Sequence, residues 1–185
     1  MSKVIQVRDK QFAVSIPEEK IREQVKRVAA EINRDYAGQH PIFLAVLNGS
    51  FIFAADLLRE VVLPCEISFV RLASYEGMGS TGEIREIMGL NVDITGRPVI
   101  IVEDIVDTGL TMAHMLETLR KHNPSNIDIC TLLLKPEKLQ VNLDIRYCCM
   151  EIPNEFVVGY GLDYAGVYRN LPYIGVLKPE IYEDK

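Results

Sequence analysis

The residues best suited to chemistry lie in the stretch from Val99 to Thr111. Glu103 and Asp104 are adjacent, and Asp107 follows three positions later. The small, turn-prone group Thr108, Gly109, Leu110 and Thr111 comes next. Three carboxylates this close repel one another unless a cation or a hydroxyl-bearing ligand lies between them. The spacing therefore favours a site for a metal ion or for sugar hydroxyls, and the alternative is a solvated acidic connection.

The flanking residues indicate how these groups are positioned. Val99 to Val102 are apolar β-formers, which predicts a buried strand covered on both faces. A helical pattern begins directly after Thr111, so the backbone N–H groups of residues 108–111 lie at a helix start, where an anion is favoured. Acid groups and anion-binding amides are thus expected about one turn apart. In the alternative interpretation, Thr108 is simply the N-cap of an ordinary helix.

The rest of the chain predicts the sheet that would hold this strand. Apolar runs at 41–47, 65–73 and 127–134 read as strands, and amphipathic helical patterns separate several of them. This alternation is typical of an α/β fold with a mostly parallel, twisted sheet flanked by helices. Polar residues fall where the predicted strands end: Asn48, Ser74, Glu103, Asp104, Asp107, Lys135 and Asp163. Ligand sites gather at such ends, so we expect one shared pocket.

Glycines follow two of the predicted strands. Gly49 succeeds the strand at 41–47, where it either frees amides for an anion or forms an ordinary tight turn. Residues 74–88 are rich in Gly, Ser and charge, which indicates a flexible excursion outside the core. Gly77, Gly79 and Gly82 satisfy the dinucleotide pattern G-x-G-x-x-G, but no apolar helical periodicity follows Gly82, so the match is weak.

Composition bounds the class of protein. The chain has 185 residues, with 48% hydrophobic and 25% charged, which fits one globular domain. Its formal charge of −6 argues against a nucleic-acid or anionic-membrane surface. Cys65, Cys130, Cys148 and Cys149 match no zinc or redox spacing and are expected to be reduced, buried thiols. No signal peptide or membrane-spanning run is visible, so a cytoplasmic location is expected.

Across nearly its whole length, the sequence resembles the hypoxanthine-guanine phosphoribosyltransferases of the type I phosphoribosyltransferase family. Val99 to Thr111 is similar to the family's motif for phosphoribosyl pyrophosphate. Four further stretches agree: 47–50, 71–75 with 80–82, Lys135, and 151–169. The resemblance implies one domain over 1–185, with a core at about 36–165, a lid at 74–88, and a small hood formed by the N-terminal arm and the C-terminal segment.

The resemblance also implies a reaction. A free 6-oxopurine would be joined to phosphoribosyl pyrophosphate in the presence of Mg²⁺, giving a nucleoside monophosphate and pyrophosphate. Glu103 and Asp104 would hold the ribose hydroxyls and the metal environment. The 5′-phosphate would lie on the segment from Asp107 through Thr108, Gly109 and Leu110 to Thr111. Asp107 would act as general base at purine N7, or would only orient the purine through a hydrogen bond.

The purine and pyrophosphate residues follow from the same resemblance. Lys135 would donate to the 6-oxo group, Phe156 and Ile105 would enclose the ring, and Val157 would contribute its backbone. For pyrophosphate, the implied residues are Leu47, Asn48, Gly49 and Arg169. Asp163 would lie beside the purine and a second Mg²⁺, and Ser74 and Tyr75 would belong to the lid. Asn48 stands where some relatives carry lysine, so that charge is missing, and a cis peptide between Leu47 and Asn48 is expected.

Other functions remain to be weighed. An orotate- or uracil-type phosphoribosyltransferase is opposed by Lys135 and by 156–163. A regulator on the same fold that binds phosphoribosyl pyrophosphate together with RNA or DNA is opposed by the acidic balance. A dinucleotide oxidoreductase has only the weak glycine pattern in its favour. The expected partners are therefore small-molecule substrates and further copies of the chain, as a homodimer or homotetramer, with no nucleic acid or membrane.

Overall fold

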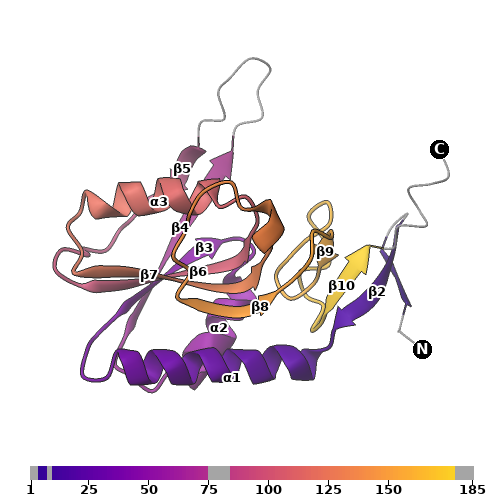
Figure 1. Ribbon diagram of the computed structural model, residues 1–185, viewed down its shortest axis with the longest axis horizontal. Helices are drawn as coiled ribbons and strands as arrows, with labels where there is room; N and C mark the ends of the chain where they lie inside the picture. Colours follow the sequence, from indigo (N-terminus) through magenta and orange to yellow (C-terminus); the bar gives the residue numbers. More distant parts are fainter. Residues whose placement is uncertain (1–3, 8–9, 75–83, 178–185) are drawn as a thin grey trace, which may run out of the picture.

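The larger of two sheets has six strands in the order β5-β4-β3-β6-β7-β8 (Figure 1). The computed structural model describes residues 4–7, 10–74 and 84–177. The strands of this sheet are β3 (Ile42–Leu47), β4 (Glu66–Ser74), β5 (Ile84–Met88), β6 (Pro98–Val106), β7 (Asn126–Leu134) and β8 (Tyr147–Glu151). Strands β4, β3, β6, β7 and β8 pair in parallel, whereas β5 pairs antiparallel with β4. The predicted α/β class is confirmed.

Helices cover both faces of this sheet. Helices α1 (Glu18–Asp35) and α2 (Phe51–Glu60) lie on one face, and α3 (Leu110–Arg120) lies on the other (Figure 1). The central strand β6 serves both layers, because Ile100 and Val102 join the apolar cluster under α1 and α2, while Val99 and Ile101 join the cluster under α3. Burial on both faces explains why the run from Val99 to Val102 is continuously apolar.

A second, four-stranded antiparallel sheet comes from the two ends of the chain. Its order is β1-β2-β10-β9, with β1 (Val4–Val7), β2 (Lys10–Ile16), β10 (Ile174–Leu177) and β9 (Val157–Val158). We call this sheet the hood. Helix α1 starts next to β2 and runs away from the hood, so the parallel strands that follow return toward it (Figure 1). The hood therefore lies beside the carboxyl ends of the parallel strands.

The segment predicted as a flexible lid, 74–88, contains a strand that the sequence pattern did not indicate. Residues 84–88 form β5, which pairs with β4 from Arg71 to Ser74. The sequence pattern failed here because Arg85 and Glu86 interrupt the apolar residues, and charged side chains are common on edge strands. Residues 75–83, including Tyr75, lie outside the described part of the chain.

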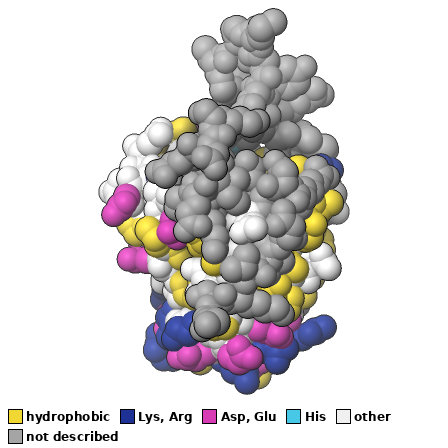
Figure 2. Space-filling model, turned by 90° about the vertical axis from the view of Figure 1, so that its right-hand side faces the viewer, with side chains coloured by type: hydrophobic (Ala, Val, Ile, Leu, Met, Phe, Trp, Pro, Cys, Tyr) yellow, Lys and Arg dark blue, Asp and Glu magenta, His cyan; other side chains and the backbone are white. Residues whose placement is uncertain are grey.

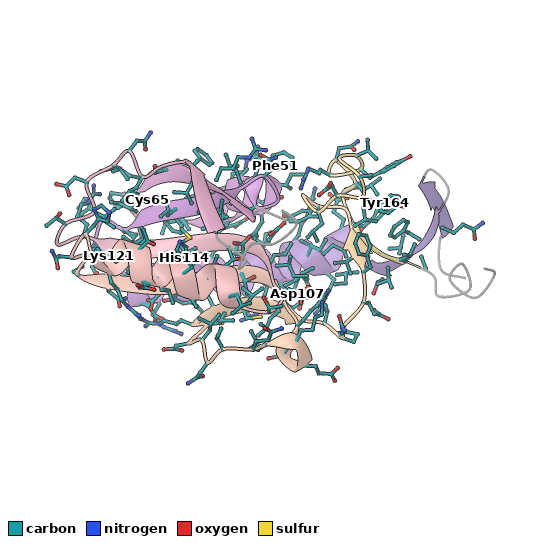
Figure 3. All side chains as sticks on the ribbon, turned by 90° about the horizontal axis from the view of Figure 1, so that it is seen from above. Phe51, Cys65, Asp107, His114, Lys121 and Tyr164 are labelled. Atoms are coloured by element: carbon teal, nitrogen blue, oxygen red, sulfur yellow. The ribbon has the colours of Figure 1, made fainter. Side chains whose placement is uncertain are left out.

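The cysteines are all free, as expected, but one prediction about them is wrong. Cys130 and Cys149 are buried and Cys148 is half-buried, whereas Cys65 is exposed in the connection before β4. Figure 3 places Cys65 at the end of the molecule remote from Asp107. Among the described residues, no helix is long and apolar enough to cross a membrane.

Candidate active site

At the end of β6, two backbone amides donate hydrogen bonds to carboxylate side chains of the same strand. The amide of Asp104 donates to Glu103 Oε1 at 3.2 Å, and the amide of Ile105 donates to Asp104 Oδ1 at 2.8 Å. Ile105 then packs against the same cluster as Ile100 and Val102, so the strict alternation of the strand ends at the acidic pair. These bonds fix the two carboxylates at the carboxyl end of β6.

Glu103 is unusually placed for a carboxylate, since it is 7% exposed. Burial raises the pKa of Glu103 well above its usual range, and the neighbouring Asp104 carboxylate raises it further. A cation beside this pair would reverse both effects, because it would favour the charged form of each acid. The carboxylates are thus set up for a positively charged ligand.

The connection from β6 to α3 forms a tight loop around Gly109. Gly109 has a φ of +82° and precedes the first residue of α3, Leu110. Thr108 is therefore not the N-cap residue of the alternative interpretation, although its Oγ1 accepts a long hydrogen bond, 3.4 Å, from the amide of Leu110. The first helical bond runs from Ala113 N to Gly109 O. The preceding amides of the first turn have no intrahelical acceptor and can face an anion.

Packing from a distant segment holds this loop. The amide of Gln140 donates to Thr108 O at 2.9 Å. A Cβ at Gly109 would lie 2.8 Å from Leu143 Cδ1 and 2.9 Å from Val141 Cγ2. The positive φ favours glycine at position 109, and the side chains of Leu143 and Val141 would have to shift to admit a Cβ there. The loop is therefore preformed by the residues that follow β7.

The loop after β3 lies directly against the acidic pair. The Leu47–Asn48 peptide is cis, as expected. A Cβ on Gly49 would overlap Asp104 Oδ2, so the backbone of the loop is in contact with that carboxylate. Gly161, with a φ of +100°, contacts the same loop, because a Cβ on Gly161 would overlap Gly49 O. Gly49 is therefore more than an ordinary turn glycine.

Asp107 faces two lysines. Lys135 Nζ lies 3.5 Å and Lys138 Nζ lies 3.1 Å from Asp107 Oδ2. Lys135 is only 6% exposed, so its amine depends on this partner. The other carboxylate oxygen, Asp107 Oδ1, is buried and has no hydrogen-bond partner among the described residues. An acceptor of this kind can take a proton or a hydrogen bond from a ligand.

The hood supplies an aromatic group and an ion pair. Phe156 is 46% exposed and lies 6.5 Å from Phe12 and 6.0 Å from Tyr164, measured between ring centroids. Its neighbour Val157 is buried in β9 and pairs with β10. Figure 3 shows Asp107 beside the start of α3, with Tyr164 on the side of the hood.

Asp163 and Arg169 form their own unit in the loop between β9 and β10. Arg169 Nη2 lies 2.7 Å from Asp163 Oδ1, and Arg169 Nη1 donates to Gly161 O at 2.7 Å. The amide of Gly166 donates to Asp163 Oδ2 at 2.7 Å. Within the described chain, Asp163 forms no ion pair with the loop from β6 to α3.

The predicted site residues thus fall into connected groups. A cavity of about 90 Å³ is lined by Glu103, Ile105, Val106, Asp107, Thr108, Gly109, Thr111 and Met112. Lys135 meets the lining of this cavity at Asp107, and Gly49 contacts Asp104, the chain neighbour of the lining residue Glu103. Arg169 touches Gly161, which meets Gly49. Ser74 ends β4, and nothing is described of its side chain.

The sequence analysis missed two residues of the candidate site, Lys138 and Gly161. Lys138 lies in the short helix η1 (Pro136–Lys138) and is nearer to Asp107 than Lys135 is. The spacing Lys-x-x-Lys across a turn after a strand end could have indicated it. Gly161 was passed over as well, although glycines on both sides of Tyr160 are a signal for unusual backbone.

The donor set near Asp104 fits Mg²⁺. No group of three or more His, Cys, Asp or Glu side chains suited to holding a metal occurs among the described residues. Mg²⁺ is commonly held by one or two carboxylates, with water and substrate phosphates completing its shell. Glu103 and Asp104 offer two such carboxylates beside a loop with free amides. The residues present therefore match a metal that arrives together with a phosphorylated ligand.

A family model and a sequence relative both connect this chain to phosphoribosyltransferases. The family model described as phosphoribosyl transferase domain matches residues 17–165. A hypoxanthine-guanine phosphoribosyltransferase from Streptococcus pneumoniae is 43% identical over 172 residues, covering 92% of this chain and 96% of the relative.

Solved structures of similar fold are also phosphoribosyltransferases. A hypoxanthine phosphoribosyltransferase from Staphylococcus aureus has a TM-score of 0.86 at 40% identity and covers 92% of this chain and 94% of its own. A hypoxanthine-guanine phosphoribosyltransferase from Bacillus anthracis, solved with a HEPES molecule in its active site, has a TM-score of 0.84 at 42% identity. That match covers 89% of this chain and 96% of the relative.

The contact between Gly49 and Asp104 predicts a compensating pair of substitutions. Gly49→Ala should lower the free energy of unfolding by about 1–3 kcal/mol, because its methyl group overlaps the carboxylate. In an Asp104→Ala background the same change should cost less than about 0.5 kcal/mol, since the overlapping atoms are gone. Urea unfolding of the four proteins measures this coupling. Equal costs in both backgrounds would contradict the contact.

Burial of Glu103 predicts that the Glu103→Gln variant is more stable than the wild type at high pH. Because the folded chain keeps the proton on Glu103 to higher pH than the unfolded chain does, the free energy of unfolding falls as pH rises from the ordinary pKa of glutamate through the raised one. Glu103→Gln removes this loss. Its urea midpoint, without added metal or phosphate, should exceed that of the wild type at pH 8 and show no such gain at pH 4. A variant less stable than the wild type at pH 8 argues against the raised pKa.

Proposed function

Because the chain belongs to the hypoxanthine-guanine phosphoribosyltransferase family, we propose that it transfers the 5-phosphoribosyl group of phosphoribosyl pyrophosphate to hypoxanthine and also to guanine. The products are IMP or GMP, together with pyrophosphate. The chain is a purine-salvage enzyme of the pentosyltransferase class. The observation that carries the choice of base is the pair Asp107 and Lys135, whose charged atoms lie 3.5 Å apart.

This pair matches one edge of a 6-oxopurine. N7 and the 6-oxo oxygen are neighbouring groups on that edge, as in guanine. Lys135 donates to the 6-oxo group, and Asp107 takes the proton from N7 as the new bond forms at N9. Lys138 stays on Asp107 Oδ2 when Lys135 turns to the base, so the carboxylate keeps one cation. An amine donor at the 6-position selects against adenine, which presents an amino group there.

The purine ring needs apolar cover as well as polar contacts. Phe156, almost half exposed, stacks on one face of the ring, and Ile105 packs on the other. The backbone of Val157 reads the purine edge beside its 2-position, with Asp163 near the same edge. A rigid aromatic surface next to two fixed polar groups is the usual composition of a small-molecule site.

Ribose and phosphate bind on the loop from β6 to α3. Glu103 and Asp104 hold the ribose hydroxyls, and the segment from Asp107 to Thr111 cradles the 5′-phosphate. The free amides of the first turn of α3 support this assignment, as does the fixed φ of Gly109. When the bond from C1′ to pyrophosphate breaks, positive charge develops at the ribosyl centre. The two carboxylates lie where they stabilise that charge.

Pyrophosphate binds between two loops. The backbone of Leu47, Asn48 and Gly49 contacts it, and Arg169 supplies a cation that is already tied to Gly161. Asn48 carries no charge. Glu103 and Asp104 would hold one Mg²⁺, and Asp163 would lie near a second. A bound Mg²⁺ would supply positive charge to offset that of the departing pyrophosphate. The adjacent oxygen donors and the raised pKa of Glu103 support a cation at this place.

We extend the proposal to the outline of the molecule. Residues 1–185 form one domain, with a core at about 36–165, a hood from both ends of the chain, and a lid at 74–88. Of the two residues proposed to contact pyrophosphate from the lid, Ser74 ends β4 and Tyr75 lies outside the described residues. A lid over the site would exclude water from the ribosyl centre. The four free thiols support a cytoplasmic location.

A homodimer or homotetramer is proposed on the same footing. Ile67 and Phe69 alternate along β4, so their side chains lie on one face of the sheet, and they are 41% and 38% exposed. Phe51, at the start of α2, is 44% exposed. Large apolar side chains left in water are typical of protein interfaces.

A regulator that binds RNA or DNA is the weaker candidate. Figure 2 shows Lys and Arg side chains interspersed with Asp and Glu along the lower edge of the molecule, where α1 lies. These charges pair along α1, as in Arg22–Glu18 and Arg27–Glu31. A nucleic-acid surface needs a stripe of one sign, which this face lacks. Nothing in the described part of the chain favours pyrimidine substrates, and NAD(H) binding has only the weak glycine pattern of the sequence in its favour.

The Lys135 assignment predicts the order of bases. With phosphoribosyl pyrophosphate and Mg²⁺, kcat/KM for hypoxanthine should exceed that for adenine by at least about 10²-fold, and Lys135→Met should remove most of this discrimination. Steady-state assays with hypoxanthine, guanine, xanthine and adenine provide the measurement. Lys121→Met, at the exposed end of α3, is the matched control. Turnover of adenine alone would refute the assignment.

The proton-transfer role predicts a slow Asp107→Asn variant. The amide keeps the size of the side chain but cannot accept the proton from N7, so the rate of chemistry should fall by about 10²-fold or more. A single-turnover experiment isolates that step from product release. Asp144→Asn, which alters an exposed carboxylate, should stay within about twofold of the wild type. An unchanged single-turnover rate in Asp107→Asn would leave Asp107 only an orienting role.

A further inference from the structure

Three successive residues after β9 have positive φ angles. The values are +99° for Gly159, +49° for Tyr160 and +100° for Gly161. Glycine adopts such angles freely, but the left-handed conformation is unfavourable for a tyrosine. Surrounding contacts must therefore hold Tyr160, and residues held in this way cluster at functional sites.

Backbone hydrogen bonds hold one side of this segment. The amide of Tyr160 donates to Leu171 O at 2.8 Å, and the amide of Gly161 donates to Arg169 O at 2.8 Å. The side chain of Tyr160 holds the other side. Tyr160 is 3% exposed, and its hydroxyl donates to Asp56 Oδ2 at 2.6 Å. Burial and this bond raise the pKa of Tyr160, so the hydroxyl remains a donor.

Asp56 lies on the helix that carries the proposed pyrophosphate loop. Helix α2 begins at Phe51, directly after Gly49 and Ser50. Ser50 Oγ donates to Val46 O at 2.6 Å, and Ser50 is fully buried, so the loop, the end of β3 and α2 are tied together. A bond from Tyr160 to α2 therefore fixes the segment 159–161 relative to the loop.

The segment 159–161 also contacts the loop at Gly49 directly. Gly161 contacts Gly49 O closely enough that no Cβ would fit, and Arg169 donates to Gly161 O. Gly49 in turn contacts Asp104. A displacement of Tyr160 would consequently reach the backbone that binds pyrophosphate and the arginine that neutralises it. Among the described residues, Tyr160 forms no hydrogen bond with the purine residues Ile105 and Lys135.

We propose that the hydrogen bond from Tyr160 to Asp56 positions the pyrophosphate loop, making both side chains positioning residues for pyrophosphate and not for the purine. This inference rests on the proposed phosphoribosyl transfer. A buried tyrosine with a partner is often only structural. The two roles differ in what the loss of the hydroxyl does to each substrate.

The test is Tyr160→Phe, which removes the hydroxyl and keeps the ring. We expect KM for phosphoribosyl pyrophosphate, and KM for pyrophosphate in the reverse reaction, to rise about tenfold, as for loss of a hydrogen bond to a charged group. KM for hypoxanthine should stay within about twofold. Asp56→Ala should give the same pattern, and the double variant should be no worse than either single one. Asp56→Asn, which keeps an oxygen acceptor, should recover most of the affinity.

Tyr36→Phe is the matched control. Tyr36 is 2% exposed, and its hydroxyl donates to Asp128 Oδ2 at 2.5 Å, near the start of β7 and away from the loop. It should lower the urea midpoint as Tyr160→Phe does but leave both KM values unchanged. Equal kinetics for the two tyrosine variants would overturn the inference. A wild type that fails to turn over hypoxanthine would instead refute the proposed function, so the two failures are distinguishable.

Discussion

The site depends on a contact made possible by the absence of two side chains. Gly49 carries no Cβ, so the loop after β3 can meet the carboxylate of Asp104, and Gly161 carries none, so the segment after β9 can meet Gly49 O. Three parts of the chain that are distant in sequence are thereby held in mutual contact at the carboxyl ends of the sheet. The proposed ribose, pyrophosphate and arginine groups take their relative positions from this stack, because each is fixed to one of its members.

Charge balance is the second constraint on this site. Burial of Glu103 beside Asp104 leaves an acid pair that favours a cation, and the net charge of −6 provides no general attraction for phosphate. Local groups must therefore bind the anions: the free amides at the start of α3, and Arg169. Lys135 and Lys138 both face Asp107, which keeps a carboxylate and an ammonium side by side. In the proposed complex, Glu103 and Asp104 would face the sugar and the lysines would face the base, so the two ends of the ribosyl bond would have opposite environments.

Local sequence pattern predicted what depends on local chemistry. The buried strand β6, its acidic end and the turn into the start of α3 followed from apolar runs and turn residues, and resemblance assigned Asp107 and Lys135 to the purine. Contacts between distant segments were beyond such patterns. Gly49 remained ambiguous because its neighbour Asp104 lies on another strand, and Lys138 and the bond from Tyr160 to Asp56 were missed for the same reason. The sequence pattern missed strand β5 because charged residues interrupt its apolar residues. The prediction that Cys65 is buried was wrong because it rested on the average burial of cysteines.

The most direct test of the proposed site is a crystal structure with Mg²⁺, phosphoribosyl pyrophosphate and an unreactive hypoxanthine analogue. We expect 5′-phosphate oxygens about 2.7–3.2 Å from the amides of the loop from Asp107 to Thr111. The ribose hydroxyls should lie at Glu103 and Asp104, and pyrophosphate should lie against Gly49. Binding of pyrophosphate away from Gly49, or of the 5′-phosphate away from the start of α3, would contradict the shared pocket on which the proposed function depends.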